Sequence, residues 1–162
     1  MKKNVVLPLA QGAVIAALYA ALTLAVAPIS YGMLQFRVSE ALCILPVFMP
    51  AAIPGLLIGC MIANAFGVVM GQAFPLDILV GSMATLIGAL LTRKFRGLTV
   101  KGIPFLSFSF PVLLNALLVG GELTYYFQTP LLPNMLWVGL GELVVCFGLG
   151  VPLFMGLRRF LS

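Results

Sequence analysis

Apolar segments dominate this chain so strongly that they decide its class. Hydrophobic residues make up 62% of the 162 residues and charged residues only 8%, whereas roughly 25% of the residues in an ordinary soluble domain are charged. A soluble domain of this length cannot bury so much apolar surface, because only part of a small fold is core. The sequence therefore predicts an all-α integral membrane protein that folds as a single domain over residues 1–162.

Six apolar stretches are candidates for membrane helices. They cover Leu9–Ala27, Val38–Pro50, Ala52–Met70, Leu76–Thr92, Pro104–Gly121 and Met135–Leu157. The second stretch is shorter than the about 20 residues of a straight span, and its prolines, Pro46 and Pro50, favour a kinked or broken segment. We expect a six-transmembrane-helix bundle with an irregular second helix.

The positive charges predict the orientation of this bundle. All of the nine Lys and Arg residues except Arg37 fall on one side of a six-span topology: Lys2, Lys3, Arg93, Lys94, Arg96, Lys101, Arg158 and Arg159. Cytoplasmic loops are enriched in Lys and Arg, so both termini are expected in the cytoplasm of a multi-pass cell-membrane protein. Charges confined to segment ends form no phosphate-binding face, which argues against a nucleic-acid partner.

The acidic residues are the main functional signal. Glu40, Asp77, Glu122 and Glu142 are the only four, and they lie inside or beside apolar segments. A charged side chain at membrane depth costs roughly 2.5–3.5 kcal/mol, so intramembrane acids usually serve a function. The expected topology places at least three of them near the outer side of the membrane, which predicts a binding pocket there.

Two of these acids also have structural interpretations. Arg37 and Glu40 are three positions apart and would share one helix face, so they are expected to pair with each other, either as a lock between loop and helix or as part of the site. Asp77 follows Pro75 at the expected start of a helix, where a carboxylate stabilises the exposed N–H groups.

Glu122 and Glu142 are stronger candidates for ligand binding. Asn115 lies seven positions before Glu122 and extends a polar line along the same helix face. Glu142 has no basic residue in its own segment, so it is either protonated or meets a cation or a donor-rich ligand, with a hydrogen bond between helices as the alternative. Two such carboxylates suit a ligand that is cationic or rich in N–H donors.

Small residues recur every four positions in the first segment, at Ala13, Ala17 and Ala21. Such stripes let helices approach closely in lipid. This stripe is therefore either an internal packing face or a docking face for another membrane subunit.

Several motifs are absent from the sequence. It has no GxxxxGK[ST] motif, so the chain cannot hydrolyse ATP by a P-loop mechanism. It has no His, which excludes Ser-His pairs and histidine metal sites. Cys43, Cys60 and Cys146 are isolated in apolar runs and are expected to be packed thiols. We therefore predict no enzyme activity, no metal and no cofactor in this chain.

The ordered motifs resemble one known family. The densest match is AALYAALTLAVAPISYGMLQFRVSEALCILPVF (Ala16–Phe48), followed by Ile53–Asn64, Leu76–Lys94 and two Gly-Glu-Leu motifs at Gly121–Leu123 and Gly141–Leu143. In these stretches the chain resembles the QueT proteins, the substrate-binding S components of energy-coupling factor (ECF) transporters for queuosine precursors.

The resemblance implies a small-molecule ligand and protein partners. The ligand would be a 7-deazaguanine such as preQ1, or preQ0 or queuine, bound in an outer pocket closed by loops. A transmembrane T component and two ATPase subunits would supply the ATP-driven step, and Ala13, Ala17 and Ala21 would dock the T component within the lipid. The implied ligand residues are Glu142 and Glu122, then Arg37, Glu40 and Asn115, with Tyr31, Phe36, Tyr125 or Trp137 stacking on the base.

Two alternatives stay open at this point. The chain is an S component for another vitamin or heterocycle, since the scaffold would be similar and the pocket different. Or it is a stand-alone proton-coupled carrier, with Glu122 and Glu142 as the proton relay.

Overall fold

A computed structural model describes residues 5–32 and 34–161 of the chain, so Lys2 and Lys3 lie outside the described residues. No β-strand occurs in the described part, which confirms the all-α prediction. The elements are α1 (Val6–Ala25), α2 (Ala27–Ser30), the 3₁₀-helix η1 (Val38–Val47), α3 (Ala52–Val69), α4 (Asp77–Lys94), α5 (Phe105–Phe127), α6 (Leu131–Gly148) and α7 (Gly150–Leu161).

Several helices are suited to crossing a membrane. In the described part of the chain, four segments are long and apolar enough: Val6–Ala25, Ala52–Val69, Phe105–Phe127 and Leu131–Phe160. α4 is not among them, and η1 has 10 residues, half of the about 20 that a straight span needs. The structure thus supports a multi-pass membrane protein, while the number of six spans stays a prediction.

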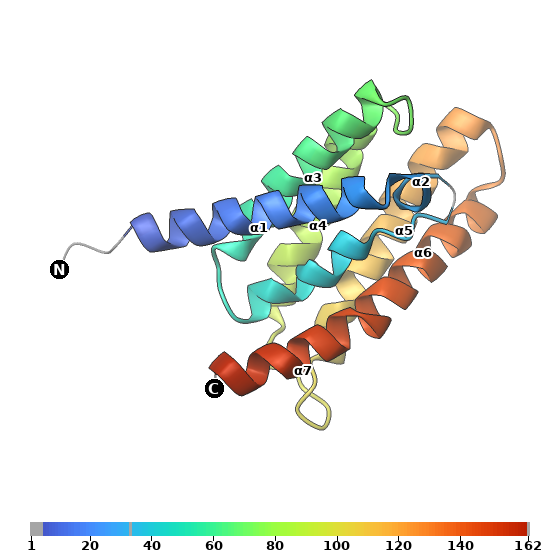
Figure 1. Cartoon of the computed structure of the whole chain (residues 1–162). Helices are drawn as coiled ribbons and strands as arrows, with labels where there is room; N and C mark the ends of the chain where they lie inside the picture. The colour runs from blue at the N-terminus through green and yellow to red at the C-terminus, as the bar shows by residue number, and fades with distance from the viewer. Residues whose placement is uncertain (1–4, 33, 162) are drawn as a thin grey trace.

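The helices form a bundle around η1. α3 packs between α1 and α4, and α5 packs between α4 and α6. η1 contacts α1, α3, α4, α5, α6 and α7, so it lies in the middle of the bundle. Figure 1 shows the start of α1, the end of α7 and the α4–α5 connection at one end. α2 and the α5–α6 connection lie at the opposite end, which we call the α2 end.

The irregular second segment is confirmed. η1 covers Val38–Val47 with Pro46 inside it, where the sequence predicted an interrupted helix over Val38–Pro50. Proline has no backbone N–H and its ring clashes with the carbonyl four residues earlier, so it disfavours a regular α-helix. A short irregular segment is tolerated at membrane depth when protein surrounds it, and the surrounding helices provide that environment.

The last expected helix is divided in two. Met135–Leu157 was predicted as one helix, but the structure has α6 up to Gly148 and α7 from Gly150. Pro152 in the first turn of α7 cannot donate a backbone hydrogen bond to the end of α6. The fifth helix instead runs further than the predicted Gly121, to Phe127, and ends at Gln128 in a left-handed conformation (φ 53°).

α1 and α3 pack unusually closely through small residues. A Cβ atom at Gly55 would lie 2.6 Å from the carbonyl oxygen of Gly12, and one at Gly59 would lie 2.7 Å from the Cβ of Tyr19. Small residues at such contacts are how membrane helices associate closely. This interface holds Tyr19 against η1, next to the buried polar residues described below.

Candidate functional site

All four acidic residues of the chain converge on one buried cation. Arg37 lies just before η1 and is only 1% exposed. Glu40 of η1 and Asp77 of α4 interact electrostatically with it, and so do Glu122 of α5 and Glu142 of α6. The four acids lie on four different helices and are all buried. We call Arg37 and these four acids the Arg37 cluster.

The predicted ion pair between Arg37 and Glu40 does not form. Arg37 Nε donates to the carbonyl oxygen of Ser30 at 3.2 Å, and its guanidinium lies 5.4 Å from the Tyr31 ring centre. Glu40 accepts hydrogen bonds from the Tyr19 hydroxyl and, at 2.8 Å, from the Cys43 thiol. The prediction was wrong because Arg37 has an extended backbone (φ −83°, ψ 92°) and does not share a helix face with Glu40.

Many buried polar atoms of this cluster, and of Gln35 and Asn115, have no hydrogen-bond partner in the protein. They are Arg37 Nη2, Gln35 Oε1, Asp77 Oδ1, Asn115 Nδ2, both carboxyl oxygens of Glu122, and Glu142 Oε1. Leaving a buried polar group without a partner costs about 1–3 kcal/mol, and such groups call for an explanation in a native fold. The set offers more acceptors than donors, which suits a ligand rich in N–H groups.

The predicted polar line on the fifth helix is confirmed. Asn115 and Glu122 are both buried on the inner face of α5, at 1% and 4% exposure. Glu142 on α6 is fully buried, and its Oε2 lies 3.8 Å from the Cys146 sulfur. These three residues therefore face the interior of the bundle, as expected from the sequence.

A cavity lies beside the cluster at the α2 end. Its volume is about 190 Å³, and it is lined by Tyr31, Gly32, Gln35, Gly71, Gln72, Phe74, Asp77, Leu123 and Phe127. This is below the roughly 300 Å³ where ordinary ligand pockets begin, so it suits part of a small, flat ligand. Asp77 is the acid that joins this cavity to the buried cluster.

The two carboxyl oxygens of Asp77 differ: one accepts a hydrogen bond from the protein and the other has no partner. Asp77 is the first residue of α4, where a carboxylate is favoured, but its Oδ2 accepts the backbone N–H of Phe74, which precedes the helix, at 2.8 Å, and no side chain caps the start of α4. Its Oδ1 has no partner, and its carboxyl group interacts electrostatically with that of Glu122. The sequence correctly placed Asp77 at the start of α4, but the predicted cap of the helix N–H groups is not observed.

The aromatic residues are distributed differently from the expectation. Tyr31 lines the cavity, but Tyr125 and Trp137 are 70% and 47% exposed and are not in the cavity wall. Phe36 is half-buried and also lies outside the wall. Phe74, which sequence reasoning missed, lines the cavity and stacks on Tyr126 with ring centres 3.8 Å apart. No sequence signal identified Phe74, because it lies in a connection between helices.

Tyr31 is fixed in place by its neighbours. Its hydroxyl donates to the carbonyl oxygen of Ala63 at 2.6 Å, and its ring fills the space above Gly67. Burial raises the pKa of the Tyr31 phenol, and the Arg37 guanidinium opposes this shift. Tyr31 is therefore a neutral hydroxyl donor that forms one rigid wall of the cavity.

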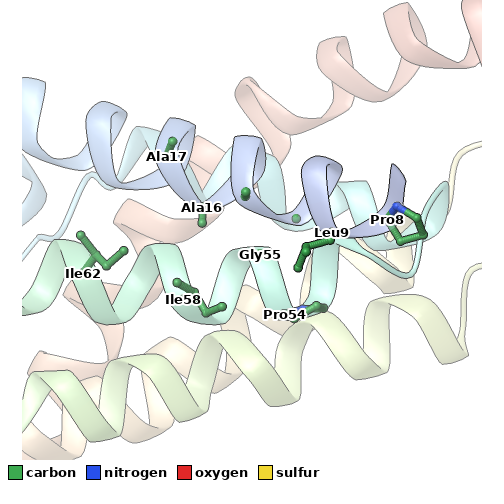
Figure 2. Close-up of a pocket in the computed structure, with 10 residues that line it drawn as sticks. Pro8, Leu9, Ala16, Ala17, Pro54, Gly55, Ile58 and Ile62 are labelled. Atoms are coloured by element: carbon green, nitrogen blue, oxygen red, sulfur yellow. The ribbon is translucent and has the colours of Figure 1, made fainter. Parts of the chain in front are cut away.

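The alanine stripe of α1 divides into two faces. Ala16 and Ala20 are buried, and Ala16 lies against Gly59 of α3. Ala13, Ala17 and Ala21 are exposed. Ala13 and Ala17 contribute to an apolar groove of about 370 Å³ between α1 and α3, with Pro8, Leu9, Gly12, Ala16, Pro54, Gly55, Ile58 and Ile62. Figure 2 shows Ile58 and Ile62 of α3 lying along this groove beside α1.

No group of three or more His, Cys, Asp or Glu side chains within residues 5–32 and 34–161 is arranged to hold a metal ion. The three cysteines are buried and free.

Comparison with known families decides the class of the protein. The family model described as "QueT transporter" matches residues 9–159 of the chain. The chain belongs to the QueT transporter family. A curated relative, the "Queuosine precursor transporter QueT" of Lactococcus lactis subsp. cremoris (strain MG1363), is 32% identical over 159 residues, covering 91% of this chain and 90% of the relative. No solved structure matches the chain.

Membership of the QueT family makes the chain a transporter protein and not an enzyme. The family resemblance expected from the sequence is thereby confirmed. The match spans α1 to α7, so it includes every residue of the Arg37 cluster and of the cavity.

Proposed function

We propose that the chain is the membrane-embedded, substrate-binding S component of an ECF importer for a queuosine precursor, a 7-deazaguanine such as preQ1. The observation that carries this proposal is the convergence of four buried acids on Arg37 beside a cavity. The curated relative is named as a queuosine precursor transporter, which supports the same substrate class.

The cluster has the chemistry to recognise a guanine-like edge. Such an edge presents a ring N–H and an exocyclic amine, and an ionised carboxylate accepts hydrogen bonds with both of its oxygens. Glu142, with Oε1 unpartnered, and Asn115, with Nδ2 unpartnered, face the interior of the bundle. Arg37 would reach only the ring carbonyl, because a 7-deaza base has carbon where guanine offers N7.

Glu40 has a different role in this proposal. Its carboxyl group already accepts from Tyr19, Cys43 and Thr85, so it has less capacity for a ligand than Glu142. We assign Glu40 to the scaffold that positions Arg37 and Glu142, and we keep Tyr31 as the aromatic wall.

Partner subunits would drive transport. The chain has no P-loop, so a T component and two ATPases would couple ATP hydrolysis to uptake. The exposed stripe of Ala13, Ala17 and Ala21, with the adjoining groove, offers a close-approach surface for the T component within the lipid.

The proposed topology has six spans, with both termini in the cytoplasm of a cell-membrane protein. It is supported by Figure 1, in which the start of α1, the end of α7 and the α4–α5 connection lie at one end of the bundle. The basic residues of that connection and of α7 support it as well. Single cysteines at the exposed positions Arg96 and Gln128 test it. A membrane-impermeant maleimide should label Gln128→Cys from outside the cell and Arg96→Cys only after lysis; the reverse pattern would invert the topology.

The function is tested by titration calorimetry of the purified protein in detergent. The ligands are preQ1, preQ0, queuine, guanine and riboflavin. Nanomolar binding of a deazapurine, with guanine and riboflavin silent, is the expected result. Binding of riboflavin or another vitamin alone would replace the substrate class, and silence for every deazapurine would overturn it. Uptake into liposomes without an ATPase partner would favour the stand-alone carrier.

A further inference from the structure

We infer that Asp77 and Glu122 form a binding site for a primary ammonium group of the ligand, with the Gln35 side-chain oxygen as a third acceptor. This inference rests on the proposed function and assigns one end of the substrate. It concerns residues on three separate elements: the segment before η1, the start of α4 and the end of α5.

The first observation is a pair of buried acids without partners. Asp77 is 3% exposed and Glu122 is 4% exposed, and the two carboxyl groups interact electrostatically. Asp77 Oδ1 and both oxygens of Glu122 have no donor from the protein. Two neighbouring carboxylates repel each other unless a proton or a cation lies between them, and in a buried setting this repulsion is weakly screened.

The second observation is independent of the acids. Gln35 is 3% exposed, lines the same cavity as Asp77, and its side-chain oxygen has no hydrogen-bond partner. Its backbone is held against α6, because the carbonyl oxygens of Leu34 and Gln35 both lie next to Gly141. An acceptor held in this way in the wall of a cavity points to a donor on a ligand.

The number and kind of acceptors favour an ammonium group. A primary ammonium carries three N–H donors and no acceptor. Asp77 and Gln35 each offer an unpartnered oxygen in the cavity wall, and Glu122, the residue before the lining residue Leu123, offers two more. Aromatic rings of Tyr31, Phe74 and Phe127 complete the wall, and aromatic faces attract cations. No Lys or Arg side chain lines the cavity; Arg37 lies outside its wall, with the guanidinium carbon 5.4 Å from the Tyr31 ring centre.

This assignment orients the substrate. The ammonium group would lie at the α2 end, between Asp77, Glu122 and Gln35. The flat ring would extend toward the deeper part of the cluster, where Glu142 and Asn115 lie. A 7-deazaguanine with an aminomethyl group would then satisfy both ends, whereas one with a neutral cyano group would satisfy only the deeper end.

The experiment compares these two 7-deazaguanines by titration calorimetry. Asp77→Asn and Glu122→Gln should each weaken binding of the aminomethyl compound by roughly 10- to 150-fold, the range for a lost charge-assisted hydrogen bond. The cyano compound should change by less than about threefold. Glu142→Gln is the matched contrast, because it should weaken both compounds by a similar factor.

Each outcome decides one claim. Equal losses for both compounds in Asp77→Asn and Glu122→Gln, or no loss for either, would overturn the ammonium site and leave the proposed function intact. A wild-type chain that binds neither compound would overturn the proposed function and this inference with it. If Asp77→Asn unfolds because its hydrogen bond from the Phe74 N–H is weakened, Glu122→Gln decides alone, since the Glu122 carboxyl oxygens accept no backbone hydrogen bond.

Discussion

Gly141 of α6 packs directly against the carbonyl oxygen of Leu34, leaving no room for a methyl group between them. The carbonyl oxygen of Gln35 is also close, 3.1 Å from where a Cβ at 141 would lie. This contact holds the segment that leads into Arg37 against the helix that carries Glu142. Because Gly141 has no side chain, the segment before Arg37 can pack directly against the helix that carries Glu142.

Gly141→Ala should displace this segment and weaken both stability and ligand binding. Overpacking of this kind costs about 1–3 kcal/mol, and here the obstacle is backbone, which cannot rotate away. Thermal unfolding and ligand titration in detergent measure the two effects. The control is Gly148→Ala in the same helix, where a Cβ meets nothing within 4 Å and where alanine favours the helix by about 0.5–1 kcal/mol. Equal stability of the two variants would contradict the prediction.

Glu142→Gln should lower ligand affinity while the protein still folds. The glutamate loses only a 3.8 Å contact with the Cys146 sulfur, and its Oε1 has no partner to lose. A charge-assisted hydrogen bond to the ligand is worth about 1.5–3 kcal/mol, which is roughly 10- to 150-fold in affinity. Titration of preQ1 measures this change, and unchanged affinity would remove Glu142 from the site.

Glu40→Gln should behave in the opposite way. Glu40 accepts from Tyr19 and Cys43 within the protein, so its neutral replacement weakens internal hydrogen bonds to a charged group. We expect a loss of about 1–3 kcal/mol in the free energy of unfolding, with little change in ligand affinity for the folded fraction. A variant that is fully stable but no longer binds ligand would place Glu40 in the binding site instead.

Hydropathy and charge predicted most of the fold because lipid strongly constrains the sequence. Apolar length located α1, α3, α4 and α5 close to their observed starts. The divided α6–α7 was missed, since apolar residues continue without a break across Leu149 and only Pro152 indicates the interruption. The central location of η1 was also out of reach, because it depends on contacts with six other helices.

The candidate site was predictable where a polar residue stood alone among apolar ones. Glu122, Glu142 and Asn115 are buried as expected. The Arg37–Glu40 pair failed because the pairing rule assumes a helix, and Arg37 has an extended backbone. The choice of Tyr125 and Trp137 as stacking rings stays a prediction; both are exposed, and near the ends of helices a small error in rotation moves a ring from the interior to the surface.

Arg37→Met should destabilise the bundle strongly. Arg37 is the cation among four buried acids, and breaking a buried charge cluster by removing one partner costs roughly 3–5 kcal/mol. The midpoint of thermal unfolding in detergent measures the loss. Arg96→Gln is the matched control, because Arg96 is exposed and surface changes usually stay within about 0.5 kcal/mol. A stable Arg37→Met protein would mean that the four acids need no cation.

Ala17→Leu should separate ligand binding from partner docking. Ala17 is exposed on α1 and borders the groove between α1 and α3, whereas Tyr19, which contacts Glu40 of the Arg37 cluster, lies on the buried face of the same helix. A leucine there fills the surface where another helix backbone would approach. We expect wild-type affinity for preQ1, together with loss of co-purification with the T component and loss of ATP-driven uptake. Val144→Phe, at an exposed position of α6 (47%), controls for added bulk on a lipid-facing surface. If Ala17→Leu assembles and transports like the wild type while Val144→Phe does not, the docking face lies on α6 and the alanine stripe serves only the packing of α1.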